Sequence, residues 1–171
     1  MAGQERRIVV GVDGSGSSKA ALRWAVHQAK LTGSSVEAVI VWQRPYIFGF
    51  AALLDGVDFE AIAKKALTEA LAEMTGLEPG VKVRPVVTGG IVAEELLRAA
   101  EGADLLVVGS RGEGGCASAL LGSVSLHCVQ HAHCPVLVLH DGFEGYEGAS
   151  GEQAEKTTAP GRTAGAATSQ A

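Results

Sequence analysis

The chain has few cysteines, few basic residues and no long apolar segment. Its 171 residues include three cysteines, an odd number that does not form the disulfide framework of a small secreted domain. No segment approaches the roughly 20 apolar residues that span a bilayer. Residues 1–7 are polar and lack the apolar core of a signal peptide. These absences predict a protein of the reducing cytoplasm with no membrane partner.

Positive charge is also scarce. Lysine and arginine together number 14 against 19 acidic residues, which gives a formal net charge of −5. No basic run is present to neutralise phosphates along a nucleic acid, so a nucleic-acid partner is not expected. Hydrophobic residues make up 47% of the chain and charged residues only 19%. This composition and length predict one compact domain with a sizeable core.

Short apolar segments alternate with segments of helical period. The predicted strands are residues 8–12, 36–42, 81–87, 105–108 and 136–139. The predicted helices start near residues 17, 59, 93 and 123. The third strand alternates apolar with polar residues and contains Pro85, which favours an edge position. Strands alternating with helices predict an α/β fold, a parallel sheet with helices on both faces and right-handed crossovers.

The composition changes after the fifth strand. From Gly142 onward glycine, alanine, serine and threonine replace any apolar period. The sequence therefore predicts one domain over residues 1–141 and a disordered tail over residues 142–171.

Glycines with regular spacing follow the fourth strand. Gly109, Gly112 and Gly122 are separated by two and nine residues, and Ser123 follows at the start of a predicted helix. Glycines let the backbone approach an anion closely, and free amides at a helix start donate hydrogen bonds to it. The segment therefore predicts a phosphate-binding cradle. Glycines that serve only a turn are the alternative.

The pattern G-x2-G-x9-G-[ST] resembles the ATP-binding branch of the universal stress protein family, and the resemblance covers about residues 6–141. It implies a five-stranded parallel sheet of order 3-2-1-4-5, Rossmann-like and similar to the adenine nucleotide alpha hydrolases. Ligands of such sheets bind beyond the carboxyl ends of the strands, where the winding reverses. That point lies between the first and fourth strands, which end at Asp13 and Gly109.

The resemblance implies ATP as the ligand. The predicted ATP-binding residues are Gly11, Val12, Asp13, Val41, Gly109, Arg111, Gly112, Gly122, Ser123, Val124 and Ser125. Asp13 is expected at the nucleoside end, because a carboxylate would repel a triphosphate; a turn or helix N-cap is its alternative role. The Val41 backbone would read adenine, and Arg111 would be either a phosphate contact or an exposed arginine. Mg²⁺ or Mn²⁺, if it accompanies ATP, would be held largely by phosphate oxygens and water.

Other chemistries fit the residues less well. The chain has neither the P-loop G-x4-G-K-[ST] nor a dinucleotide fingerprint after the first strand. His127, Cys128, His131, His133 and Cys134 form a cluster in which two histidines share a helix face, as in some metal sites. A surface helix face is the preferred interpretation, so no metal site is predicted. A metal- or thiol-sensing module remains the third hypothesis.

The glycine segment holds no evident general base except Glu113, so binding is favoured over hydrolysis. The first hypothesis is an ATP-binding regulatory module of the stress response that acts on an unidentified protein partner. A slow ATPase or phosphotransferase is the second.

The fifth strand is short, apolar and at the sheet edge in the implied order. Pairing with a second copy through Val136, Leu137, Val138 and Leu139 would cover that edge, as the resemblance implies. The sequence therefore predicts a homodimer. The apolar loop from Tyr46 to Leu54 could cover the nucleotide, dock a protein or pack on the chain itself.

Overall fold

The computed structural model describes residues 5–44, 55–74, 78–112 and 120–142. In chain order the elements are β1 (Arg7–Gly11), α1 (Gly16–Thr32), β2 (Ser35–Trp42), α2 (Phe59–Ala72), β3 (Val83–Gly89), α3 (Val92–Ala99), β4 (Leu105–Gly109), α4 (Ser123–His131) and β5 (Val136–Leu139). The apolar loop and residues 143–171 of the predicted tail lie outside the described residues, so both predictions remain untested.

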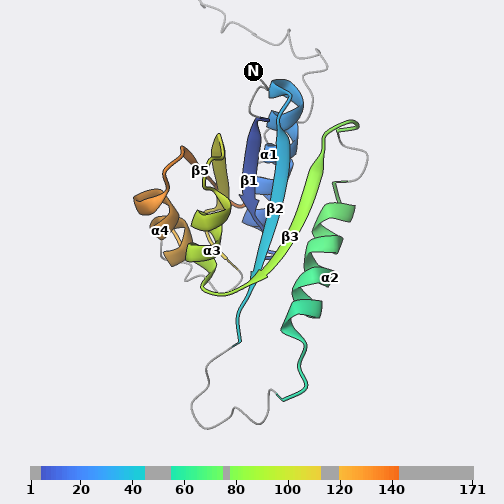
Figure 1. Cartoon of the computed structure of the whole chain (residues 1–171), viewed down its shortest axis with the longest axis vertical. Coiled ribbons are helices and arrows are strands. Elements are labelled where there is room, and N and C mark those ends of the chain that lie inside the picture. The colour runs from blue at the N-terminus through green and yellow to red at the C-terminus, as the bar shows by residue number, and fades with distance from the viewer. Residues whose placement is uncertain (1–4, 45–54, 75–77, 113–119, 143–171) are drawn as a thin grey trace, which may run out of the picture.

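The strands form one parallel sheet in the order β3-β2-β1-β4-β5 (Figure 1). At its centre, Val10 of β1 pairs with Ala38 of β2 on one side and Val107 of β4 on the other. The chain winds outward from β1 through β2 to β3, and then crosses to β4 on the other side. The α/β class and the strand order are therefore confirmed.

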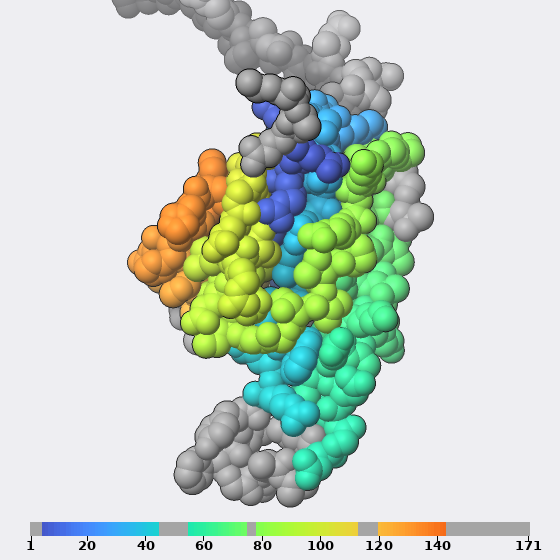
Figure 2. Space-filling model, viewed as in Figure 1, coloured from blue at the N-terminus to red at the C-terminus, as the bar shows by residue number. Residues whose placement is uncertain are grey.

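Helices cover both faces of the sheet. Neighbouring residues of a strand point to opposite faces, so the continuous apolar run of β1 makes both of its faces apolar. Val10 faces a core with Leu22 of α1 and Leu67 of α2. Val9 faces a second core with Leu96 of α3 and Cys128 of α4. In the space-filling view α3 and α4 lie next to each other, with α2 on the opposite side (Figure 2). The central strand is thus buried on both faces, as its continuous apolar run predicts.

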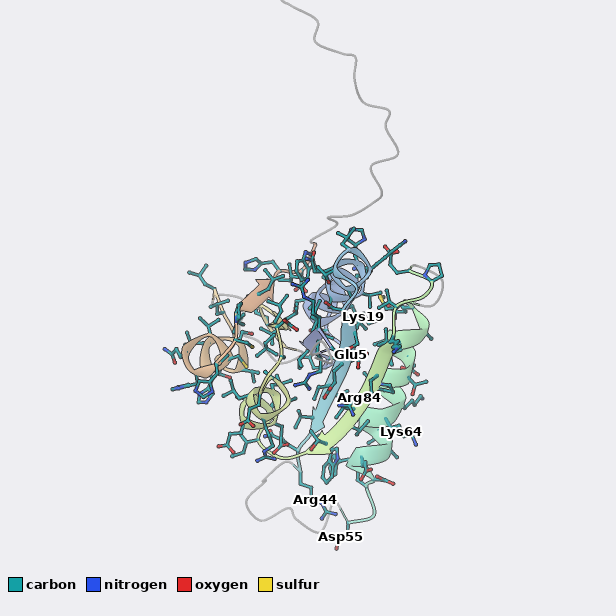
Figure 3. The ribbon with its side chains drawn as sticks, turned by 45° about the horizontal axis from the view of Figure 1, so that its top comes forward. Glu5, Lys19, Arg44, Asp55, Lys64 and Arg84 are labelled. Carbon is teal, nitrogen blue, oxygen red and sulfur yellow. The ribbon has the colours of Figure 1, made fainter. Side chains whose placement is uncertain are left out.

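Most charged side chains lie on the outside of these layers. Lys64 on α2 and Arg84 on β3 are exposed to solvent (Figure 3). Among the helices of the described ranges, none is both long and apolar enough to cross a membrane.

Strand β3 differs from the prediction at both ends. It spans Val83–Gly89, whereas the sequence pattern predicts residues 81–87. The reason is its register with β2: the pairing starts at Val36 with Val83 and continues to Trp42 with Gly89. Pairing therefore begins and ends two residues later than predicted. The predicted edge position is confirmed, and Pro85 is exposed there.

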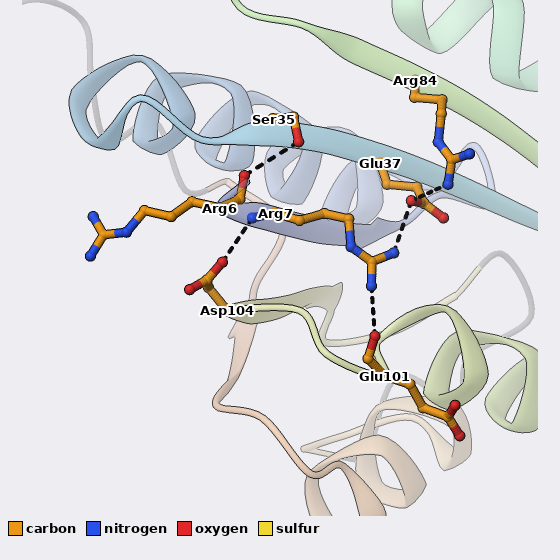
Figure 4. A network of polar contacts seen from close by, with 7 residues as sticks. All are labelled: Arg6, Arg7, Ser35, Glu37, Arg84, Glu101 and Asp104. Carbon is orange, nitrogen blue, oxygen red and sulfur yellow. Dashed lines mark hydrogen bonds and ion pairs between the residues drawn. The ribbon is translucent and has the colours of Figure 1, made fainter. Parts of the chain in front are cut away.

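The Glu37 carboxylate of β2 lies on the face of the sheet that α3 and α4 cover, and it links β2 to both of its neighbours, β1 and β3. The Glu37 side chain is only 6% exposed and pairs with Arg7 at 3.0 Å and with Arg84 at 2.5 Å (Figure 4). Arg7 also donates to the Glu101 carbonyl at 2.6 Å, which ties β1 to the end of α3. Burial by itself raises the pKa of Glu37, but the hydrogen bonds and charges of Arg84 and Arg7 outweigh it and hold the pKa below its ordinary value.

We expect Glu37→Gln to lower the free energy of unfolding by about 2 kcal/mol at pH 7, since a largely buried carboxylate loses its charge-assisted bonds. The folded-state pKa is lowered, so this contribution is complete above the ordinary value of 4.5 and is lost as pH falls through the folded-state pKa. Urea unfolding at pH 7 to 3 should show the difference between wild type and variant shrinking below about pH 4.5.

The control is Glu69→Gln, which removes an acid from an exposed pair with Lys65 at 3.9 Å on α2. That change should cost less than about 0.5 kcal/mol. A Glu37→Gln difference that stays constant down to pH 3 would contradict the ionised pair.

Candidate functional site

A cavity of about 340 Å³ lies at the carboxyl ends of the central strands. All eleven predicted ATP-binding residues line it: Gly11, Val12 and Asp13 at the end of β1, Val41 on β2, Gly109, Arg111 and Gly112 at the end of β4, and Gly122, Ser123, Val124 and Ser125 at the start of α4. The parallel pairing of β1 with β4 brings these distant segments to one place. Their roles toward a ligand stay predictions.

The structure adds an apolar wall that sequence reasoning missed. Ser18 and four branched aliphatic residues also line the cavity: Val39, Val92, Leu96 and Val108. A Cβ atom on Gly11 would lie only 3.1 Å from Leu96 Cδ1, so α3 packs directly against the end of β1. In the sequence these aliphatic residues look like ordinary core positions. The only available signal was the strand alternation that places Val39 on the same face as Val41.

The start of α4 is open toward the cavity. Gly122 caps the helix without a side-chain hydrogen bond, and the first backbone bond to it comes from Leu126 N at 2.9 Å. In contrast, Ser15 Oγ caps α1 and the Asp58 carboxylate caps α2. The first amides of a helix have no acceptor within it. The amides of Ser123 and Val124 are therefore available to an anion, and the helix dipole favours one there.

The three motif glycines differ in what a side chain at each position would meet. A Cβ on Gly109 would lie 2.5 Å from Ser17 Oγ and 2.9 Å from the backbone of Ser17, so the close approach of α1 requires glycine there. A Cβ on Gly112 would meet Asp13 Oδ2 at 2.6 Å. A Cβ on Gly122 would meet only ordinary contacts, the nearest at 3.5 Å. The protein's own packing thus leaves space at Gly122, on the side where the α4 amides begin.

Asp13 makes the turn contacts that the sequence predicts as the alternative to ligand binding. Its Oδ1 accepts from Ser15 N at 3.0 Å and from Ser15 Oγ at 2.6 Å, while Ser15 itself is the N-cap of α1. The other oxygen, Oδ2, points toward Gly112. One carboxylate oxygen therefore orders the loop after β1, and the second faces the glycine segment.

Serine hydroxyls fix the loops around the cavity. Ser17 Oγ donates to the Arg111 carbonyl at 2.5 Å, and Ser125 Oγ donates to the Gly109 carbonyl at 2.6 Å. The Ser125 hydroxyl thus holds the start of α4 over the end of β4. Ser110 lies between these contacts, and its buried Oγ has no hydrogen-bond partner in the described part of the chain.

The residues of the alternative metal or thiol cluster do not converge in the described part of the chain. The His127 and His131 rings lie on the exposed face of α4, tilted by 44° with centroids 4.3 Å apart, whereas Cys128 is fully buried. Burial, with a smaller effect of nearby Cys134, raises the pKa of the Cys128 thiol to about 11, which disfavours a metal-binding thiolate. No three ligand-type side chains converge within the described ranges. The packing interpretation of Cys128 is confirmed, while Cys116 and Glu113 lie outside these ranges.

The two serines offer a matched test of the site. Ser125→Ala should lower the free energy of unfolding by about 1–2 kcal/mol, because it removes the donor to the Gly109 carbonyl. Ser110→Ala should cause no loss, because it removes a buried hydroxyl without a partner. Urea unfolding of both variants checks this. Equal destabilisation by the two substitutions would contradict the assigned bonding.

Comparisons with known proteins agree with this architecture. The universal stress protein family model matches residues 5–140. A universal stress protein of Mycobacterium tuberculosis is 34% identical over 141 residues, covering 81% of this chain and 46% of that protein. One from Methanocaldococcus jannaschii is 34% identical over 138 residues, covering 78% of this chain and 81% of that protein. This chain thus spans about half the length of its mycobacterial relatives.

Solved structures show the same fold. A universal stress protein in complex with cAMP is 29% identical, with a TM-score of 0.57 over 80% of this chain and 97% of that one. The match of the family model over most of the chain, the level of identity and the shared sheet lead to one conclusion. The chain belongs to the universal stress protein family.

Proposed function

We propose that this chain binds ATP in the cavity between β1 and β4, and that the bound nucleotide controls its interaction with a regulatory partner in the stress response. The observation that carries the proposal is the open start of α4 at Gly122, where packing leaves room and helix amides are available. The phosphates would lie against Ser123 and Val124.

We also propose a cytoplasmic location, which the free thiols at Cys128 and Cys134 support.

The rest of the cavity supports an adenine nucleotide. Its aliphatic wall, from Val39 to Leu96 and Val108, offers an apolar slot for a planar base. Asp13 would accept from ribose hydroxyls through Oδ2, the oxygen that Ser15 does not occupy. The relative solved in complex with cAMP supports an adenine nucleotide as the class of ligand. Mg²⁺ or Mn²⁺ would be held mainly by phosphate oxygens and water.

Binding is better supported than hydrolysis. Asp13 is the only carboxylate among the described residues that line the cavity; Ser15 already occupies its Oδ1, and the ribose would occupy its Oδ2. A general base must reach the attacking water with a free oxygen. We therefore propose a nucleotide-dependent regulator, with slow ATP hydrolysis or phosphate transfer as the alternative.

We expect Gly122→Glu to abolish ATP binding, with a loss of at least ~100-fold in affinity, or about 3 kcal/mol. The new side chain would fill the space before α4 and place a negative charge where the phosphates bind. The backbone at Gly122, with φ −71° and ψ 160°, suits any residue, so the fold should persist. Isothermal titration with ATP, AMP and cyclic AMP, together with circular dichroism, measures both effects.

The control is Gln130→Glu, which adds the same charge near the far end of α4, where the side chain is exposed. It should bind ATP like the wild type. Wild-type affinity in a folded Gly122→Glu variant would refute the proposed phosphate position.

We also propose a homodimer formed through β5. Among the described residues this strand pairs with β4 alone, which leaves its other edge open to a second copy. The Pro135 carbonyl accepts from Leu106 N of β4, and the Leu139 carbonyl accepts from Ser110 N directly after β4. By alternation the backbone groups of Val136 and Val138 point to the open edge. Antiparallel pairing of two such edges about a twofold axis would satisfy these groups in both copies.

Val138→Pro should convert the dimer to a monomer, because it removes an outward-facing donor while leaving the hydrogen bonds to β4 intact. Light scattering at micromolar concentration measures the mass. Leu137→Pro is the control: its amide faces β4, so that change should destabilise the fold instead. A folded Val138→Pro variant that remains dimeric would place the interface elsewhere. A monomeric wild type would exclude the homodimer altogether.

A further inference from the structure

Asp141 follows β5 and is not among the residues that line the cavity, yet its carboxylate lies 4.0 Å from the guanidinium of Arg111, which does line it. We propose that Asp141 competes with the ligand's phosphates for Arg111 and so sets how much negative charge the site accepts. This inference rests on the proposed nucleotide binding and assigns a selectivity residue to the same site.

The geometry places Asp141 between two positive groups. Its Oδ2 lies 4.0 Å from Arg111 Nη2, and its Oδ1 would lie 3.1 Å from a Cβ on Gly16, the first residue of α1. The helix dipole favours an anion beside the start of α1. The carboxylate is therefore held near the helix start, on one side of the Arg111 guanidinium, while Arg111 itself lines the cavity.

The contact between Asp141 and Arg111 is loose enough to be exchanged. Charge-assisted hydrogen bonds are about 2.7–2.9 Å long, whereas this pair is separated by 4.0 Å. The Asp141 side chain is 53% exposed and that of Arg111 33%. The Arg111 carbonyl is fixed by Ser17 Oγ, so the guanidinium can turn toward a phosphate without movement of the loop backbone.

The charge balance of the lining makes this competition matter. Among the described lining residues, Arg111 is the only lysine or arginine and Asp13 the only acid, so their formal charges cancel. Asp141 adds one negative charge next to the arginine. It cancels part of the attraction of Arg111 for phosphates, and this loss grows with each charge on the ligand, is absent for a neutral nucleoside and is screened by salt.

The experiment is isothermal titration of wild type and Asp141→Asn with ATP, AMP and adenosine in magnesium-free buffer, so that ATP keeps its full charge. At low salt we expect affinity to rise about fivefold for ATP, about twofold for AMP and not at all for adenosine. At 0.5 M salt the gains should disappear. In an Arg111→Gln background the gain for ATP should fall below about twofold, because the competition acts through Arg111.

Glu69→Gln is the matched control, since it removes one acid from a pair of nearly the same length, 3.9 Å, on the outer side of α2. It should leave all three affinities unchanged. Weaker ATP binding by Asp141→Asn would show that Asp141 positions Arg111 rather than competing for it. Equal gains for ATP and adenosine would show a purely structural effect. Either result overturns the inference while nucleotide binding stands, whereas a wild type that binds no ATP overturns both.

Discussion

The pairing of β1 with β4 is the constraint on which the rest of the structure depends. It puts the chain's two central strands side by side although most of the domain separates them in sequence. Because α1 leaves β1 toward one face and α4 approaches from the other, the strand ends are left uncovered between them. The cavity is thus a consequence of the winding direction, as in other open parallel sheets. The serine bonds to the Gly109 and Arg111 carbonyls then fix its rim.

The glycine motif combines a folding requirement with the proposed binding role. Gly109 is needed because α1 packs against the backbone there, and it would be needed without any ligand. Gly122 has no such packing requirement, and its missing side chain opens the start of α4. Substitutions at these two positions should therefore separate loss of fold from loss of binding.

In this acidic protein, backbone groups would form the proposed anion site. The chain carries a net charge of −5, and the described lining contributes a single arginine. The positive potential must come mainly from helix amides, whose dipoles are fixed by the fold and need no lysine. Such a site is only weakly attractive at long range, so a single nearby carboxylate such as Asp141 can change its preference.

Sequence by itself determined the elements, because strand burial and helix period depend on local residue patterns. With the family resemblance it also gave the strand order and eleven residues that meet in one cavity. It placed β3 two residues too early, because its ends depend on register with β2. It also grouped Cys128 with His127 and His131. In the structure the two histidines lie together on the exposed side of α4, whereas Cys128 points into the core.

Only the tertiary structure decided which aliphatic residues face a cavity and which fill a core. Leu96 and Val108 have the same local pattern in either case, and their position depends on how α3 crosses the sheet. The proximity of Asp141 to Arg111 and Gly16 likewise arises from three separate segments. Contacts of this kind depend on the packing of distant parts of the chain, about which local composition and period carry no information.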